Sequence, residues 1–264
     1  MFLEYFSEIT DTYLTIGADL ADRNDIALLA MLGGILPSLI WLWFWLKEDK
    51  KRPEPRLRLA LTFVTGMVTG FLVLPFQYFS DWLISPVEQL ITNPLVVSFL
   101  FFGLWAFSEE FAKYLAAYFS ALRTKVAEER VDSIIYLITA ALGFSAFENS
   151  LYLLAPLLEG SWLASVVLVN FRFIGASLLH IASSAIIGFF LAFSFYKGKF
   201  YRKISLILGL ILATGLHTIF NLLIIEGKVI ATLAMLGLVW IVVVIVLLLL
   251  EKVKKLPYPS IRLN

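Results

Sequence analysis

Long apolar segments alternate with short polar ones along most of the chain. Crossing a bilayer takes about 20 mainly apolar residues in a helix that rises about 1.5 Å per residue. Seven segments meet this requirement: 27–46, 57–79, 94–122, 133–156, 164–196, 203–225 and 229–250. The fifth is too long for one straight span, so we expect an interfacial turn at its start. The pattern predicts an all-α, polytopic membrane helix bundle of about seven transmembrane helices.

The polar stretches between the spans carry helix-start signals. Ser85-Pro86, with Glu88 three residues after the serine, predicts a short surface or re-entrant helix over 85–92. Asn93-Pro94 marks the start of the third span in the same way. Residues 1–26 are acidic and aromatic and lack the basic start of a secretory signal, so we expect an N-terminal interfacial segment. A transmembrane domain over 27–252 and a cytoplasmic tail over 253–264 follow.

The basic residues predict the orientation of the bundle, because lysine and arginine concentrate in cytoplasmic loops. All 21 lysines and arginines follow the first, third, fifth or seventh span, except Arg23, Lys113, Arg172 and Lys228. Arg23 and Lys228 lie on the opposite side, and the other two lie inside spans. The asymmetry predicts an outside N-terminus and an inside C-terminus, and we expect a multi-pass protein of the plasma membrane.

The composition agrees with a lipid environment. Hydrophobic residues make up 60% of the chain and charged residues 16%, against about 45–50% and about 25% in soluble domains. The absence of cysteine excludes disulfides, thiolate metal sites and a cysteine nucleophile. A net charge of +1 predicts no nucleic-acid partner. Glycine and serine in the spans permit dimer contacts without requiring them, so the oligomeric state stays open.

Charged and polar side chains inside the spans are the candidate functional residues. They comprise Glu109, Glu110, Lys113, Glu148, Arg172, His180 and His217, with Asn221 one turn after His217. Five formal charges facing lipid would cost about 12–17 kcal/mol. We therefore expect these residues to face one another or a water-filled cavity that opens toward the outside. Glu110 points about 100° away from Glu109 around the helix, so the two carboxylates can have different partners.

The spacing of these residues resembles a known family. Glu109-Glu110-x-x-Lys113, Gly143-Phe144-x-x-x-Glu148, a later histidine and His217-x-x-x-Asn221 occur in order over spans three to six. This resembles the PrsW family of membrane-embedded proteases, which make the first cut in anti-sigma factors. The related CAAX prenyl endopeptidases and abortive-infection proteins fit less well, since they carry arginine at a different spacing from Lys113 and histidine in place of Glu148. The resemblance implies hydrolysis of peptide bonds in membrane-anchored protein substrates.

The residues allow two versions of this chemistry. Without cysteine, water is the simplest nucleophile, and we assign Glu110 as the base that activates it. Glu109 and Lys113 would orient Glu110, while His217 and Asn221 would position water or stabilise the oxyanion.

A zinc version is also chemically sensible, because two histidines and a glutamate with an open fourth position form a known catalytic set. Glu148, His180 and His217 are the candidate metal ligands, with Glu148 alternatively orienting a histidine. No H-E-x-x-H helix is present, so the sequence leaves zinc open.

Other interpretations remain. Glu109 with Lys113 can form a structural ion pair, and Arg172 can be a structural or gating charge that pairs with a glutamate. Buried glutamate and histidine also build proton relays in transporters, although no internal repeat of the transporter type is evident. A non-catalytic scaffold that binds membrane peptides is a third hypothesis.

Overall fold

The computed structural model describes residues 23–48, 53–225 and 228–256. In chain order its helices are α2 (Asn24–Leu46), α3 (Arg56–Leu90), α4 (Pro94–Ala117), the π-helical turn η2 (Tyr118–Leu122), α5 (Arg130–Leu158), α6 (Trp162–Ile174), α7 (Ala176–Ser194), α8 (Lys199–Ile225) and α9 (Val229–Lys254). With α4–η2 and α6–α7 each taken as one span, seven helices are long and apolar enough to cross a membrane. The all-α bundle of seven transmembrane helices is confirmed. Most of the predicted interfacial segment and of the predicted C-terminal tail lies outside the described residues.

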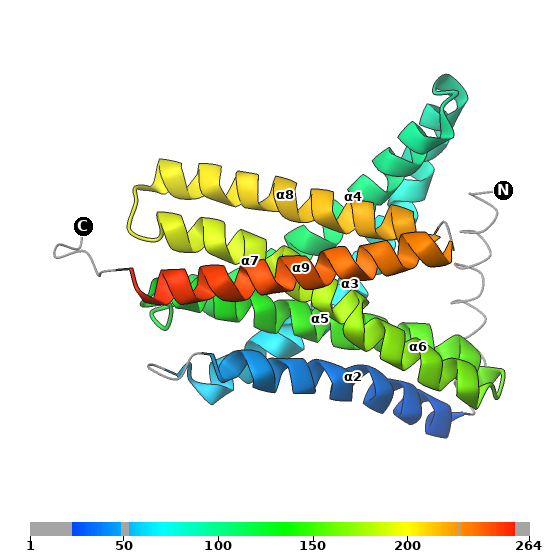
Figure 1. The fold of residues 1–264 in the computed structure, drawn as a ribbon, viewed down its shortest axis with the longest axis horizontal. Helices are drawn as coiled ribbons and strands as arrows, with labels where there is room; N and C mark the ends of the chain where they lie inside the picture. Colours follow the sequence, from blue (N-terminus) through cyan, green and yellow to red (C-terminus); the bar gives the residue numbers. More distant parts are fainter. Residues whose placement is uncertain (1–22, 49–52, 226–227, 257–264) are drawn as a thin grey trace.

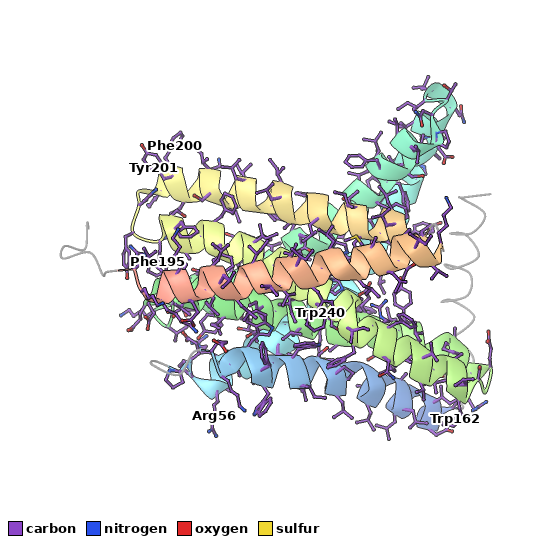
Figure 2. The ribbon with its side chains drawn as sticks, in the orientation of Figure 1. Arg56, Trp162, Phe195, Phe200, Tyr201 and Trp240 are labelled. Carbon is purple, nitrogen blue, oxygen red and sulfur yellow. The ribbon has the colours of Figure 1, made fainter. Side chains whose placement is uncertain are left out.

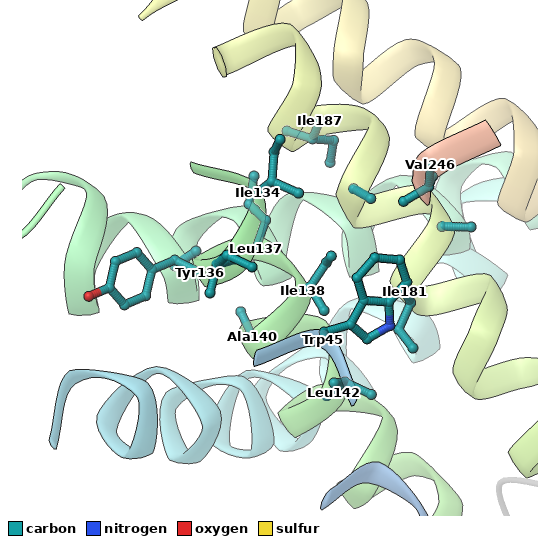
Figure 3. Close-up of a cluster of buried hydrophobic side chains, with 14 of the residues drawn as sticks. Trp45, Ile134, Tyr136, Leu137, Ile138, Ala140, Leu142, Ile181, Ile187 and Val246 are labelled. Atoms are coloured by element: carbon teal, nitrogen blue, oxygen red, sulfur yellow. The ribbon is translucent and has the colours of Figure 1, made fainter. Parts of the chain in front are cut away.

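Helix α5 is the centre of the bundle. The most apolar stretch of α5 is 89% buried, whereas those of α2, α3, α4, α8 and α9 are only 28–33% buried because they face the surroundings. Figure 3 shows the core around α5, where Ile138 and Leu142 meet Trp45 of α2 and Ile181 of α7. This arrangement places α5 next to α4, α6 and α7, which carry candidate functional residues, while α8 with His217 packs against α4 and α7.

Two glycines let α3 and α5 approach to backbone contact. A Cβ atom at Gly143 of α5 would overlap the carbonyl oxygen of Phe63, and one at Gly66 of α3 would overlap the carbonyl oxygen of Ala140. Small residues permit this close approach between membrane helices. The contact fixes the rotation of α5, and with it the direction in which Glu148 points.

The α3–α4 hairpin differs from the prediction. Helix α3 is one continuous helix of 35 residues, so the separate helix expected over 85–92 is wrong. Pro86 cannot donate a hydrogen bond to the carbonyl of Trp82, but the Ser85 hydroxyl donates to that same carbonyl at 3.0 Å and the helix continues. Asn93 caps α4 as predicted, since its side chain accepts from the backbone N–H of Leu95 at 3.0 Å. The far ends of α3 and α4 extend away from the other helices (Figure 1).

The fifth span is broken in its middle. Its start is helical as α6, not the expected interfacial turn, and the break falls at Gly175, with φ −117° and ψ −80°. A Cβ atom at this position would lie 2.9 Å from the Phe171 carbonyl oxygen and 2.8 Å from Leu236. The indole N–H of Trp41 in α2 donates to the Phe173 carbonyl at 3.0 Å, which satisfies a backbone acceptor beside the interruption.

The two ends of the bundle differ in their residues. Arg56, Phe195, Phe200 and Tyr201 lie at one end and Trp162 lies at the other (Figure 2). Among the described residues, the basic residues of the loops lie at the first end, apart from Arg23 before α2 and Lys228 before α9. Aromatic residues at both ends suit the two membrane–water interfaces. The inside position of the basic end stays a prediction.

Candidate active site

Six helices bring their polar side chains together near the middle of the bundle. The cluster consists of Gln77 (α3), Glu109, Glu110 and Lys113 (α4), Glu148 and Asn149 (α5), His180, Ser183 and Ser184 (α7) and His217 (α8), with Arg172 from the end of α6. The structure therefore joins every charged residue and both histidines that the sequence singled out. Asn221 lies half-buried one turn beyond His217, and among the described residues it has no hydrogen-bond partner.

Lys113 lies at the centre of the cluster and has no exposed surface. Its ammonium donates to Glu110 Oε1 at 2.6 Å and to His180 Nδ1 at 2.8 Å, while Glu109 Oε2 is 4.0 Å away. The i, i+4 spacing suggested Glu109 as the partner of Lys113, but the i, i+3 pair with Glu110 is much closer. Since an ammonium only donates, His180 Nδ1 must accept, so the proton of the neutral ring lies on Nε2.

Glu110 is fully buried and both of its carboxylate oxygens are engaged. Oε1 accepts from Lys113, from the Ser183 hydroxyl at 2.8 Å and from His217 Nδ1 at 2.8 Å. Oε2 accepts from the Ser184 hydroxyl at 3.4 Å. An ionised carboxylate only accepts, so His217 carries its proton on Nδ1 and leaves Nε2 as a free lone pair.

Glu109 has one engaged oxygen and one free oxygen. Its Oε1 accepts from the Gln77 side-chain amide at 3.0 Å. Its Oε2 is buried and has no hydrogen-bond partner among the described residues; it lies 3.7 Å from His217 Nε2. A buried carboxylate oxygen without a partner is costly unless something else binds it. The sequence analysis missed Gln77, although a lone amide in the apolar run of α3 was a usable signal.

Glu148 lies on the more open side of the cluster, with 22% of its side chain exposed. Its Oε2 accepts from Arg172 at 2.6 Å and from His180 Nε2 at 2.8 Å. Arg172 also donates from Nε to Asn149 Oδ1 at 2.6 Å and lies 3.9 Å over the Tyr152 ring. Arg172 thus pairs with a glutamate, as one of the sequence hypotheses held.

Three of these residues can hold a metal ion. Glu109, His180 and His217 each offer one ligand atom within 4.8 Å of the others, and they form the one such group among the described residues. The 3.7 Å between Glu109 Oε2 and His217 Nε2 is close to the roughly 3.4 Å that separates two ligands held about 2.0–2.1 Å from a tetrahedral zinc ion. The free oxygen of Glu109 and the free nitrogen of His217 already face each other.

The surroundings of the histidines also fit a metal. Nδ1 of His217 bonds to Glu110 and Nε2 of His180 bonds to Glu148, and metal-binding histidines characteristically donate their other N–H to a carboxylate in this way. His180 can ligate through Nδ1 if Lys113 gives up its bond there. This geometric group contains Glu109 where the sequence suggested Glu148, whose carboxylate bonds to the Nε2 side of His180. The identity of the metal ligands stays a prediction.

Known proteins with similar sequences give independent information. A family model described as PrsW family intramembrane metalloprotease matches residues 54–249. Proteins named Protease PrsW are similar to this chain in Halalkalibacterium halodurans (28% identity, 72% of this chain and 81% of that protein), Geobacillus kaustophilus (27%, 74% and 79%) and Bacillus subtilis (27%, 70% and 77%). No solved structure matches the chain.

Proposed function

The chain belongs to the PrsW family of intramembrane metalloproteases, and from this premise we propose that it cleaves membrane-anchored proteins at the Glu109–His180–His217 centre. The free, buried Oε2 of Glu109 opposite His217 Nε2 is the observation that carries the proposal. The protein is a multi-pass membrane protease. Its location in the plasma membrane and its action on a single-span substrate of the anti-sigma-factor class are further parts of the proposal.

Glu109, His180 and His217 would hold a zinc ion, which would supply a Lewis acid that polarises the scissile carbonyl. Glu110 accepts the N–H of His217 Nδ1 and so leaves Nε2 of that ring free to bind a metal. Glu148 accepts the N–H of His180 Nε2 and so leaves Nδ1 of that ring as the metal-binding nitrogen. Lys113 balances the charge of Glu110 and so keeps that carboxylate ionised in the bundle. Apolar packing around α5 keeps bulk water away from the centre.

Glu148 is the residue that we propose as the acceptor of the proton from the attacking water. Its Oε2 binds Arg172 and His180, whereas its Oε1 is left for water at the more open side of the cluster. The sequence favoured Glu110 for this role, but Glu110 is 0% exposed and has four donors around it. A base has to reach the proton that it removes, and this requirement favours Glu148.

The test is cleavage of single-span membrane substrates by the purified protein in vesicles, with zinc content measured in parallel. We expect Glu148→Gln to abolish cleavage and retain zinc, and Glu109→Gln to lose both. Glu110→Gln should retain part of the cleavage activity and part of the zinc content, because the carboxamide oxygen can still accept a hydrogen bond from His217. An exposed-lysine variant, Lys199→Gln, serves as the control. Wild-type protein that binds zinc and cleaves no substrate would refute the proposed activity, and equal cleavage by wild type and Glu148→Gln would refute the assigned base.

A further inference from the structure

Arg172 is a charged residue that the proposed chemistry does not use, although it lies against the cluster. Only 12% of its side chain is exposed. Its guanidinium group makes three contacts. One terminal nitrogen donates to Glu148 Oε2, Nε donates to Asn149 Oδ1, and the face of the group lies on the Tyr152 ring. A planar guanidinium held on three sides is rigid, so it can fix the carboxylate that it binds.

The partner residues of Arg172 are themselves fixed. The Asn149 side-chain amide donates to the hydroxyls of Ser145 at 3.2 Å and Ser177 at 3.1 Å. Ser145 belongs to α5 and Ser177 to the first turn of α7. Asn149 therefore connects the central helix, the start of α7 and, through Arg172, the end of α6. A displacement of α5, of the start of α7 or of the end of α6 would therefore move Arg172 relative to Glu148.

Arg172 lies next to the break at Gly175. Arg172 occupies the last turn of α6, so its position relative to α7 depends on the geometry of the break. The indole of Trp41 bonds to the Phe173 carbonyl and its ring lies 5.1 Å from the Phe173 ring. Trp41 belongs to α2, which precedes the stretch of residues 54–249 that matches the family. A helix outside the matched stretch thus holds the break in place.

We propose that Arg172 is a positioning residue that acts through Glu148 on His180. Arg172 and His180 share Oε2 of Glu148, so the guanidinium sets the direction of this oxygen and the oxygen sets the ring of His180. The proposal rests on the proposed function, because a fixed Glu148 matters only if His180 binds a metal ion at the Glu109–His180–His217 centre. Loss of a partner behind a metal-binding histidine typically lowers metal affinity about 10–100-fold.

The experiment compares Arg172→Gln, Arg172→Lys and Arg123→Gln in the full-length protein in detergent micelles. Arg123 is the matched control, since it also lies over an aromatic ring, that of Phe119, but at the basic end of the bundle. Zinc affinity is measured by competition with a chromophoric chelator, and kcat and KM are measured on a single-span substrate. A thermal melt of each apo-protein reports on folding.

We expect Arg172→Gln to lower zinc affinity about tenfold and to lower kcat with little change in KM. Arg172→Lys should recover part of both, since an ammonium can hold Glu148 but cannot also bond to Asn149 in the same geometry. Wild-type zinc affinity in a folded Arg172→Gln protein would overturn the proposal, as would a change confined to KM, which would make Arg172 a substrate-binding residue. If Arg172→Gln does not fold, Arg172→Lys decides: wild-type zinc affinity and kcat in that variant would overturn the proposal. Reduced zinc affinity in a series whose wild type cleaves nothing would retain the positioning role and refute the protease assignment.

Discussion

Replacing Lys113 by methionine tests whether the buried charge network stabilises the bundle. Methionine has a similar length and is apolar, so the change removes the ammonium with little loss of volume. Lys113 has no exposed surface and holds Glu110 at 2.6 Å and His180 at 2.8 Å. Without it, the carboxylate of Glu110 stays buried next to neutral donors only.

The magnitude follows from the partners that remain. Removing one member of a buried ion pair costs about 3–5 kcal/mol, because the other charge is left without compensation. In the variant, Glu110 still accepts hydrogen bonds from the hydroxyls of Ser183 and Ser184 and from the N–H of His217. Because these bonds partly compensate the buried charge, the cost should lie at the lower end of the range. We therefore expect Lys113→Met to lower the free energy of unfolding by about 3 kcal/mol.

The assay is unfolding by titration with sodium dodecyl sulfate in mixed micelles, followed by circular dichroism. The double variant Lys113→Met/Glu110→Gln removes both charges, so it should recover at least about 1 kcal/mol relative to Lys113→Met alone. Lys199→Met, at an exposed position, should stay within about 0.5 kcal/mol of wild type. A Lys113→Met protein as stable as wild type, or a double variant whose cost is the sum of the two single costs, would refute the reasoning.

Three further predictions concern packing, a buried hydrogen bond and orientation. Gly143→Ala should cost about 1–3 kcal/mol in the same titration, because the new Cβ overlaps the Phe63 carbonyl oxygen; a wild-type value would contradict the close contact of α3 and α5. Tyr136→Phe loses the hydrogen bond from the tyrosine hydroxyl to the buried carboxylate of Glu54 and should lower the free energy of unfolding by about 1.5–3 kcal/mol. An unchanged unfolding midpoint would count against this bond. The chain has no cysteine, so single-cysteine variants report orientation: Lys228→Cys should react with an impermeant maleimide in intact cells, and Arg202→Cys only after permeabilisation. The reverse pattern would overturn the predicted topology.

Part of the architecture follows directly from the order of residues. A bilayer has a fixed thickness, and it offers no hydrogen bonds to an exposed backbone, so apolar runs of the observed lengths can only be helices that span it. The start of α4 at Asn93-Pro94 could also be predicted from the sequence, because the side-chain cap and the proline both act within one helical turn. The continuation of α3 through Pro86 was missed because it depends on one serine rotamer, which bonds to the carbonyl that the proline leaves free.

The charged residues and the two histidines of the polar cluster were also predictable, since the cost of charge in lipid forces such residues to face one another, whereas Gln77 was missed. The partners within the cluster were not. Helical spacing suggested Glu109 as the partner of Lys113, and only the packing of α4 against α7 and α8 decided that Glu110 forms the closer ion pair with Lys113. The same packing left Oε2 of Glu109 free opposite His217.

The sequence by itself determined how many helices cross the membrane and which side chains must be hidden from lipid, because both depend on the length and polarity of single segments. The tertiary structure decided which of those side chains touch. Contacts such as Gly143 on Phe63 and Trp41 on Phe173 set the rotation of α5 and the break between α6 and α7. A rotation of one helix by a single residue, about 100°, would turn a side chain from the cluster to the lipid, and no pattern within one segment fixes that angle.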